Sequence, residues 1–242
     1  MDKMKIDIWS DIACPYCYIG KRKLRNALAQ FPHAGEIELV RHSYELNPDL
    51  PKAPLGKSIY AYLAGQNGIA EEVQREKMKS ILSLAESVGL AYDLDRVVVT
   101  NTSDALRLIC LAQERRLGSE VEEALFKAYF IDGETVSDPA TLLKLGLGAG
   151  LQESEIKEML AGGLYLDKIK EDIRYSEDCL DLQYIPFYLF NNNHIIQGSL
   201  AEEAYLEVLN KAYNDWKQNG ISEENGGERF TGKACSIDGV CN

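Results

Sequence analysis

The sequence predicts an α/β fold in which short strands lie near both ends of the chain and a long run of helices separates them. Apolar and polar residues alternate near the N-terminus, and strand-forming residues return around residue 190. Between residues 58 and 161, apolar residues instead recur at helical spacing, with glycines at the breaks. These two observations predict the fold class.

The first predicted strand covers residues 5–9, and a turn over 10–13 leads into the tetrapeptide Cys14-Pro15-Tyr16-Cys17. A helix is predicted to begin here, because the amide that Pro15 lacks would have no partner in a first helical turn. Two cysteines two residues apart at a strand-to-helix junction are placed to make and break a disulfide. A redox enzyme is therefore the first hypothesis.

The predicted position of Cys14 is chemically informative. At a helix N-terminus, unpaired amides and the positive end of the helix dipole stabilise a thiolate, which is the nucleophile of disulfide exchange. In such settings the pKa of a cysteine falls from ~8.5 to ~3.5–7.5. Cys17, inside the first turn, is then the expected resolving cysteine.

Zinc binding is the main alternative use of two cysteines at this spacing, and it needs a second pair of ligands. Cys235 and Cys241 offer one, although the five residues between them exceed the usual spacing. A proline directly after the first cysteine favours redox chemistry. We expect His33, His42 and His194 to be surface or packing residues, because they are not in ligand spacing.

Composition bounds the remaining possibilities. The 242 residues suit one large domain or a core with an insertion, and 45% are hydrophobic. A formal net charge of -12 argues against a basic surface for nucleic acid or for anionic membranes. No apolar run approaches the ~18 residues of a membrane span. We expect a cytoplasmic protein, in which Cys110 and Cys179 are packing residues rather than disulfide partners.

The order of the predicted elements is β-α-β, then helices, then β-β-α, which suits a thioredoxin fold with a large α-helical insertion between the second and third strands. The later elements are a strand at 36–43, helices at 58–65, 70–88, 102–116, 119–131, 138–149, 153–161 and 166–176, strands at 186–191 and 194–198, and a helix at 200–216. We therefore expect a discontinuous thioredoxin-like domain over 1–50 and 166–218. Residues 51–165 form the inserted helical domain, and 219–242 a flexible tail that carries a cysteine pair.

The chain resembles a known family, the DsbA-like thioredoxin-fold oxidoreductases, and within it the cytoplasmic FrnE-like branch. The resemblance spans nearly the whole chain. It is carried by the segments 8–21, which contain the cysteine motif, 44–48, 101–102, 128–130, 185–187 and 234–239.

The resemblance implies the roles of several residues. Cys14 would attack, Cys17 would resolve, and Ile185-Pro186 would be a cis-proline segment that faces the disulfide and holds substrate backbone. Pro15 and Tyr16 are expected to contact substrate. Tyr16, together with Tyr18 and Phe187, either offers exposed aromatic surface to a thiol-bearing peptide or belongs to the core. Cys235 and Cys241 are a candidate auxiliary redox pair.

The implied activity is thiol-disulfide exchange without a bound cofactor or metal, with glutathione as a candidate co-substrate. The expected partners are a protein or peptide that bears a disulfide or thiol, and glutathione or a thioredoxin system as electron partner. Two alternatives stay open. One is a glutathione-dependent transferase or isomerase of the kappa type, which uses serine where Cys14 stands. The other is a zinc-holding binding module. Many thioredoxins carry a buried acid where this chain has Ile8, so the proton acceptor for Cys17 is not identified.

Overall fold

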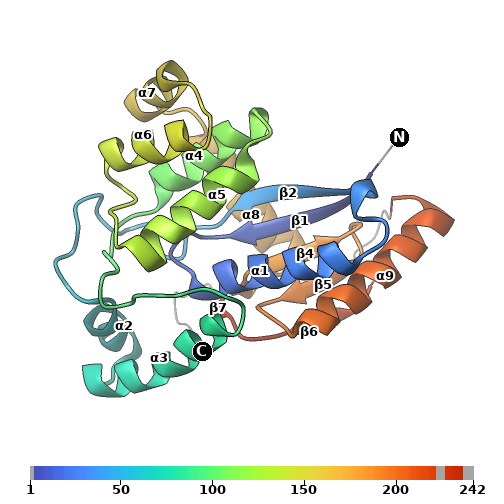
Figure 1. The fold of residues 1–242 in the computed structure, drawn as a ribbon, viewed down its shortest axis with the longest axis horizontal. Coiled ribbons are helices and arrows are strands. Elements are labelled where there is room, and N and C mark those ends of the chain that lie inside the picture. Colours follow the sequence, from blue (N-terminus) through green and yellow to red (C-terminus); the bar gives the residue numbers. More distant parts are fainter. Residues whose placement is uncertain (1–2, 222–226, 237–242) are drawn as a thin grey trace.

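The computed structural model describes residues 3–221 and 227–236, and these contain a five-stranded mixed sheet in the order β2-β1-β4-β5-β6 (Figure 1). The first two strands are parallel, with Met4 opposite Ile37, and β4 runs antiparallel to both β1 and β5. The strands are β1 (Met4–Ser10), β2 (Ile37–Ser43), β4 (Phe187–Phe190), β5 (His194–Gln197) and β6 (Arg229–Thr231). The mixed α/β fold is as predicted.

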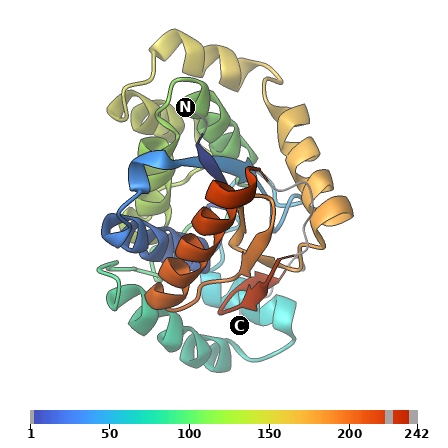
Figure 2. The same cartoon turned by 90° about the vertical axis from the view of Figure 1, so that its right-hand side faces the viewer.

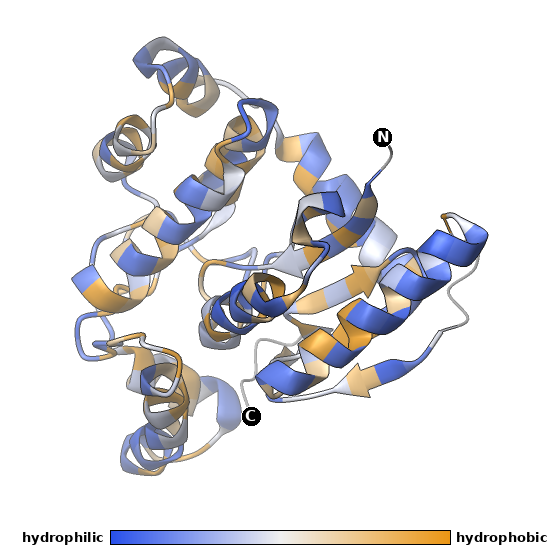
Figure 3. Cartoon of the chain, turned by 45° about the vertical axis from the view of Figure 1, so that its right-hand side comes forward, coloured by the Kyte–Doolittle hydropathy of each residue, from blue (hydrophilic) through white to orange (hydrophobic). Residues whose placement is uncertain are grey.

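Helices cover both faces of this sheet. On one face, α1 (Pro15–Gln30) and α9 (Glu202–Asn219) lie side by side (Figure 2). Their buried residues, among them Leu24 and Leu209, form one apolar cluster with Ile6 and Phe190 of the strands. In Figure 3 the strands behind α9 are largely hydrophobic, whereas much of the helix surface is hydrophilic. On the opposite face, α8 (Leu166–Leu180) packs against β2.

The helices between β2 and α8 form two groups (Figure 1). One is the pair α2 (Ile59–Asn67) and α3 (Glu71–Glu86). The other contains α4 (Ser103–Glu114), α5 (Gly118–Lys127), α6 (Pro139–Gly148) and α7 (Glu153–Ala161). Two of these helices begin with a side-chain N-cap. Ser58 and Asp138 each accept a hydrogen bond from an amide in the first turn of the helix that follows. The helix predicted over 119–131 continues after Lys127 as a π-helical turn, Ala128–Asp132.

The prediction of a flexible tail over residues 219–242 is wrong for part of this segment. Residues Arg229–Thr231 form β6, which extends the sheet parallel to β5, and Cys235–Ser236 form β7. Strand β7 pairs antiparallel with the short strand β3 (Tyr184–Ile185). Composition predicted flexibility because this segment is polar and rich in glycine, but its backbone groups complete the edge of a sheet.

Candidate active site at the start of α1

The cysteine motif lies where β1 ends and α1 begins. Cys14 is the N-cap residue of α1, with extended backbone angles, and Pro15 occupies the first helical position. The amide of Cys17 donates to the carbonyl of Cys14 over 3.1 Å, which closes the first turn. Both cysteines are free thiols and both are buried, with 0% and 2% of their surfaces exposed. The spacing in the sequence therefore places both sulfurs in one helical turn, as predicted.

The segment Ile185-Pro186 reaches the same place from the other end of the chain. The peptide bond between these residues is cis, as predicted. The Cys14 thiol lies 3.8 Å from the carbonyl oxygen of Ile185, to which it donates a hydrogen bond. Residues 171 positions apart in the chain thus meet at one sulfur atom.

The Cys17 thiol is buried inside the first turn of α1. Burial is the largest cause that raises its pKa well above the ordinary value, and the neighbouring Cys14 adds to it. The raised pKa keeps the Cys17 thiol protonated near neutral pH.

Asp11 is a polar group at the site whose burial the sequence did not predict. Its side chain is 1% exposed, and burial raises its pKa to about 6. Its carboxylate accepts hydrogen bonds from the amides of Ala13, at 3.2 Å, and Leu46, at 2.8 Å. The bond from Ala13 lies within the turn itself. The bond to Leu46 goes further, because it ties the cysteine turn to the segment after β2.

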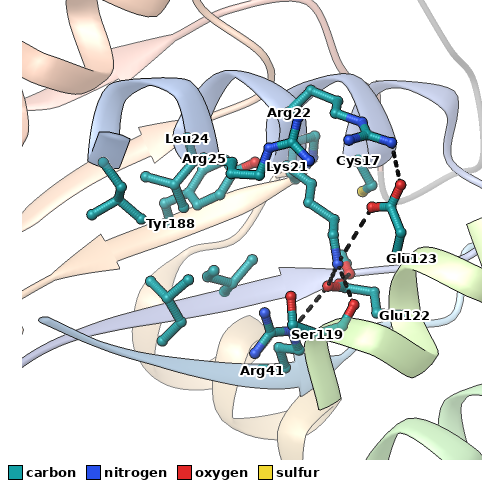
Figure 4. Close-up of a pocket in the computed structure, with 15 residues that line it drawn as sticks. Cys17, Lys21, Arg22, Leu24, Arg25, Arg41, Ser119, Glu122, Glu123 and Tyr188 are labelled. Carbon is teal, nitrogen blue, oxygen red and sulfur yellow. Dashed lines mark hydrogen bonds and ion pairs between the residues drawn. The ribbon is translucent and has the colours of Figure 1, made fainter. Parts of the chain in front are cut away.

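A cavity of about 90 Å³ lies on the inner side of α1, between the helix, the sheet and α5 (Figure 4). Cys17 and Pro186 line one part of it. An ion cluster lines another part, in which Lys21 and Arg41 approach the carboxylate of Glu122 at 2.6 Å and 2.9 Å. Burial alone would raise the pKa of Glu122, but the two cations outweigh it and hold the pKa at about 2.

The aromatic residues around the motif are core residues. Tyr16, Tyr18 and Phe187 are 2%, 1% and 0% exposed, so the predicted exposed aromatic surface is absent and the core alternative holds. Burial raises the pKa of Tyr16 to about 12. The carbonyl of Pro15 accepts a hydrogen bond of 2.7 Å from the hydroxyl of Tyr92, a residue between α3 and α4 that the sequence did not single out.

The remaining cysteines differ from one another. Cys235 is fully buried, is disulfide-bonded and lies opposite Ile185 in the β3–β7 pair, whereas Cys241 lies outside the described residues. Cys110 is buried, as predicted, and burial raises its pKa to about 11. Cys179 is exposed, so the expectation that it packs in the core is wrong. It lies on α8 and lines an open hollow together with His42 and Asp172.

His42, predicted to be a surface or packing residue, packs against the sheet and also joins two carboxylates. Its ring nitrogens lie 2.7 Å from Asp7 and 2.9 Å from Asp172, and the ring stacks on Trp9 at 4.3 Å. Burial lowers the pKa of His42, but the two carboxylates outweigh it and raise the pKa above the ordinary value. The cluster fastens α8 to the sheet.

Within residues 3–221 and 227–236, no group of three or more histidine, cysteine, aspartate or glutamate side chains could hold a metal ion. None of the helices in these same ranges is long and apolar enough to cross a membrane.

The sequence and the fold of this chain match those of known proteins. The model of the DSBA-like thioredoxin domain matches residues 5–210. The crystal structure of a probable DsbA oxidoreductase from Streptomyces coelicolor is 30% identical and superposes with a TM-score of 0.81, covering 99% of this chain and 98% of that one.

Two further relatives are more distant. The cytosolic disulfide reductase DsbM of Pseudomonas aeruginosa, solved with GSH, is 16% identical, with a TM-score of 0.58 over 88% of this chain and 98% of that one. The YwbO protein of Bacillus subtilis is 22% identical over 205 residues, which are 84% of this chain and 94% of that protein. On the match to the domain model and the similarity to the Streptomyces structure, this chain belongs to the family of DsbA-like thioredoxin-domain proteins.

Proposed function

We propose that the protein is a thiol-disulfide oxidoreductase whose reactive pair is Cys14 and Cys17. One observation carries the proposal: the Cys14 sulfur lies at the N-terminus of α1 and 3.8 Å from the carbonyl of Ile185, next to the cis-proline. A helix N-terminus stabilises a thiolate, and the adjacent backbone can bind a substrate in the extended conformation.

The reaction follows from disulfide exchange. The Cys14 thiolate attacks one sulfur of a substrate disulfide, whose other sulfur leaves as a thiolate and takes up a proton. Cys17 then loses its proton and attacks the Cys14 sulfur of the mixed disulfide. The second substrate thiol is released. The substrate has gained two electrons, and the Cys14 and Cys17 thiols have lost them in forming their disulfide. The same steps in reverse oxidise a substrate dithiol.

The substrate class we propose is a protein or peptide that bears a disulfide or thiol. An apolar hollow beside the motif supports it, because Pro15 lines this hollow together with Tyr62, Leu63 and Met78 of the helical part. We propose that the inserted helices, residues 51–165, form this wall of the substrate site. The thioredoxin-like part, residues 1–50 and 166–218, supplies Cys14, Ile185 and Pro186.

Cys14 is buried, so a segment has to move before a substrate disulfide reaches its sulfur. Strand β7 is the described segment that pairs beside it, through Ile185 and Cys235. We propose that Cys235 and Cys241 are an auxiliary pair that exchanges electrons with the reactive cysteines. Serine at both tail positions should slow turnover without abolishing it, and an unchanged turnover number would exclude the pair from the reaction.

Glutathione is the small-molecule partner we propose, supported by the GSH in the structure of DsbM, and a thioredoxin-type protein is the alternative electron partner. We propose a cytoplasmic location, since DsbM is cytosolic. A cytosolic glutathione poise of about -220 to -320 mV would keep the pair reduced if its potential lies above that range, which favours reductase or isomerase activity.

The test is the reduction potential of the Cys14-Cys17 pair in glutathione buffers, read by thiol trapping with mass mapping of all six cysteines. Cys14→Ser should abolish exchange, whereas Cys17→Ser should trap a mixed disulfide. Exchange that survives in the Cys14→Ser protein would refute the assignment. A conjugation assay with glutathione separates the kappa-type transferase alternative.

A further inference from the structure

Tyr92 lies outside the cysteine motif, and its side chain bonds to the backbone of the motif. Its hydroxyl donates to the carbonyl oxygen of Pro15 over 2.7 Å. Its ring stacks between two other rings, with centroids 6.0 Å from Tyr18 and 4.7 Å from Phe130. Next to it, the amide of Asp93 donates to the carbonyl of Phe130 over 2.8 Å. Tyr92 therefore holds the Pro15 carbonyl from a segment that is itself fixed.

The Pro15 carbonyl belongs to the peptide group whose amide is that of Tyr16. Because Pro15 has no amide hydrogen, Tyr16 supplies the first N–H of α1 after Cys14. The first amides of a helix have no partners within it and carry its positive end. A hydrogen bond accepted by a carbonyl polarises its peptide group and strengthens the N–H at the other end. The Tyr92 hydroxyl is thus coupled to the first N–H of the helix for which Cys14 is the N-cap.

The hydroxyl also remains a donor under the conditions in which a thiolate forms. Burial, with a smaller contribution from Cys14, raises the pKa of Tyr92 well above its ordinary value. The phenol therefore keeps its proton throughout the range in which cysteine titrates.

We propose that Tyr92 is a positioning residue for the reactive cysteine: its hydroxyl fixes and polarises the peptide between Pro15 and Tyr16, and so stabilises the Cys14 thiolate. The proposal rests on the proposed function, because it assigns Cys14 as the attacking group. It also gives the inserted helices a part in the chemistry, since Tyr92 comes from residues 51–165.

The test compares Tyr92→Phe with Tyr18→Phe. Each variant keeps its ring in the aromatic stack and loses one hydroxyl, but the Tyr18 hydroxyl donates to the Glu123 carboxylate at 2.7 Å rather than to the cysteine turn. Cys17→Ser is the background, so that Cys14 titrates alone within the motif. Thiolate formation is read by ultraviolet absorbance, as the difference from a protein that also carries Cys14→Ser.

In Tyr92→Phe, the midpoint of thiolate formation should move to higher pH by about half a unit, the size of a helix-terminus charge effect. With Cys17 restored, the equilibrium constant with glutathione should change about threefold toward the disulfide, or ~15 mV toward a more negative potential. Tyr18→Phe should leave both readings unchanged. Equal shifts in the two variants, or no shift in Tyr92→Phe, would overturn the proposal.

A second variant separates the hydroxyl from packing. Tyr92→Leu loses the ring as well, so it should melt lower than Tyr92→Phe yet show the same thiolate midpoint. A midpoint that follows the loss of stability across the two variants would refute the positioning role. Failure of the proposed function is visible separately, because the unsubstituted protein would then form no Cys14-Cys17 disulfide at any glutathione ratio.

Discussion

Substituting Glu122 should destabilise the protein more than any other single change in charge at the cavity behind Cys17. Glu122 lies on α5, and its carboxylate contacts Lys21 of α1 and Arg41 of β2. Its side chain is 6% exposed. Glu122→Gln keeps the shape and removes the charge, which leaves two cations close together with little water around them. Removing one partner of a buried ion pair costs ~3–5 kcal/mol.

The pKa of Glu122 gives a second value for the loss of stability. The pKa falls from an ordinary value of 4.5 to about 2 in the folded protein. At ~1.4 kcal/mol per unit, the charged carboxylate contributes ~3 kcal/mol to the free energy of unfolding near neutral pH. Because the folded pKa is the lower one, this contribution is complete above the unfolded value and is lost as the pH falls toward about 2.

Urea unfolding at neutral pH and at about pH 3 tests this reasoning, since the difference between Glu122→Gln and the unsubstituted protein should shrink at the lower pH. Glu123→Gln is the matched control. Its carboxylate pairs with Arg22 but is 33% exposed, so its loss should cost at most ~1 kcal/mol. Equal destabilisation by the two variants, or a cost for Glu122→Gln that does not depend on pH, would refute the assignment of the ion cluster.

Three further substitutions have defined outcomes. Gly20→Ala places a Cβ against the hydroxyl of Tyr188 and 3.1 Å from the Pro186 ring, so we expect ~1–3 kcal/mol of destabilisation by urea unfolding and slower disulfide exchange than in the unsubstituted protein. Gly198→Ala combines a φ of 82° with a Cβ 2.7 Å from a backbone oxygen, and hydrogen exchange should become faster in residues 229–236 and not in β1. His42→Asn should lower the free energy of unfolding by ~2 kcal/mol at about pH 6. The loss should shrink as the pH rises through the raised pKa of His42, because the protonated ring is the form that stabilises the fold. A loss that grows toward alkaline pH would contradict the ion cluster.

The parts of the site that the sequence predicted are those fixed by local rules. The position of Cys14 at the start of α1 could be predicted because a strand and a turn come before it and a proline comes directly after it. All three signals lie within about fifteen residues of the sequence. Pro186 was found through its resemblance to a family segment and through its place at the start of a strand. Local periodicity likewise located the helices of the insertion to within a few residues.

The parts that the sequence did not predict depend on contacts between distant segments. Tyr92, between α3 and α4, and Glu122, on α5, reach α1 from segments whose placement no local pattern specifies, and neither residue stands out in the sequence. Strand β6 was missed because its side chains carry no strand pattern. Its pairing comes from the open edge of β5, which only the folded sheet provides.

The contacts of Tyr92 and Glu122 both involve α1. Among the contacts of the inserted region with the first two turns of α1 are the Tyr92 hydroxyl on Pro15, the Phe126 ring 4.9 Å from that of Tyr18, and the Glu122 carboxylate on Lys21. A helix anchored in this way keeps its N-terminal amides fixed relative to the Cys14 sulfur, and preorganised dipoles stabilise charge more effectively than dipoles that must reorient. If the anchoring matters for the chemistry, loosening it at Tyr92 should change the thiolate at Cys14 more than its cost in stability explains. Loosening it at Glu122 should act mainly on stability, because that contact lies a full helical turn beyond Cys17.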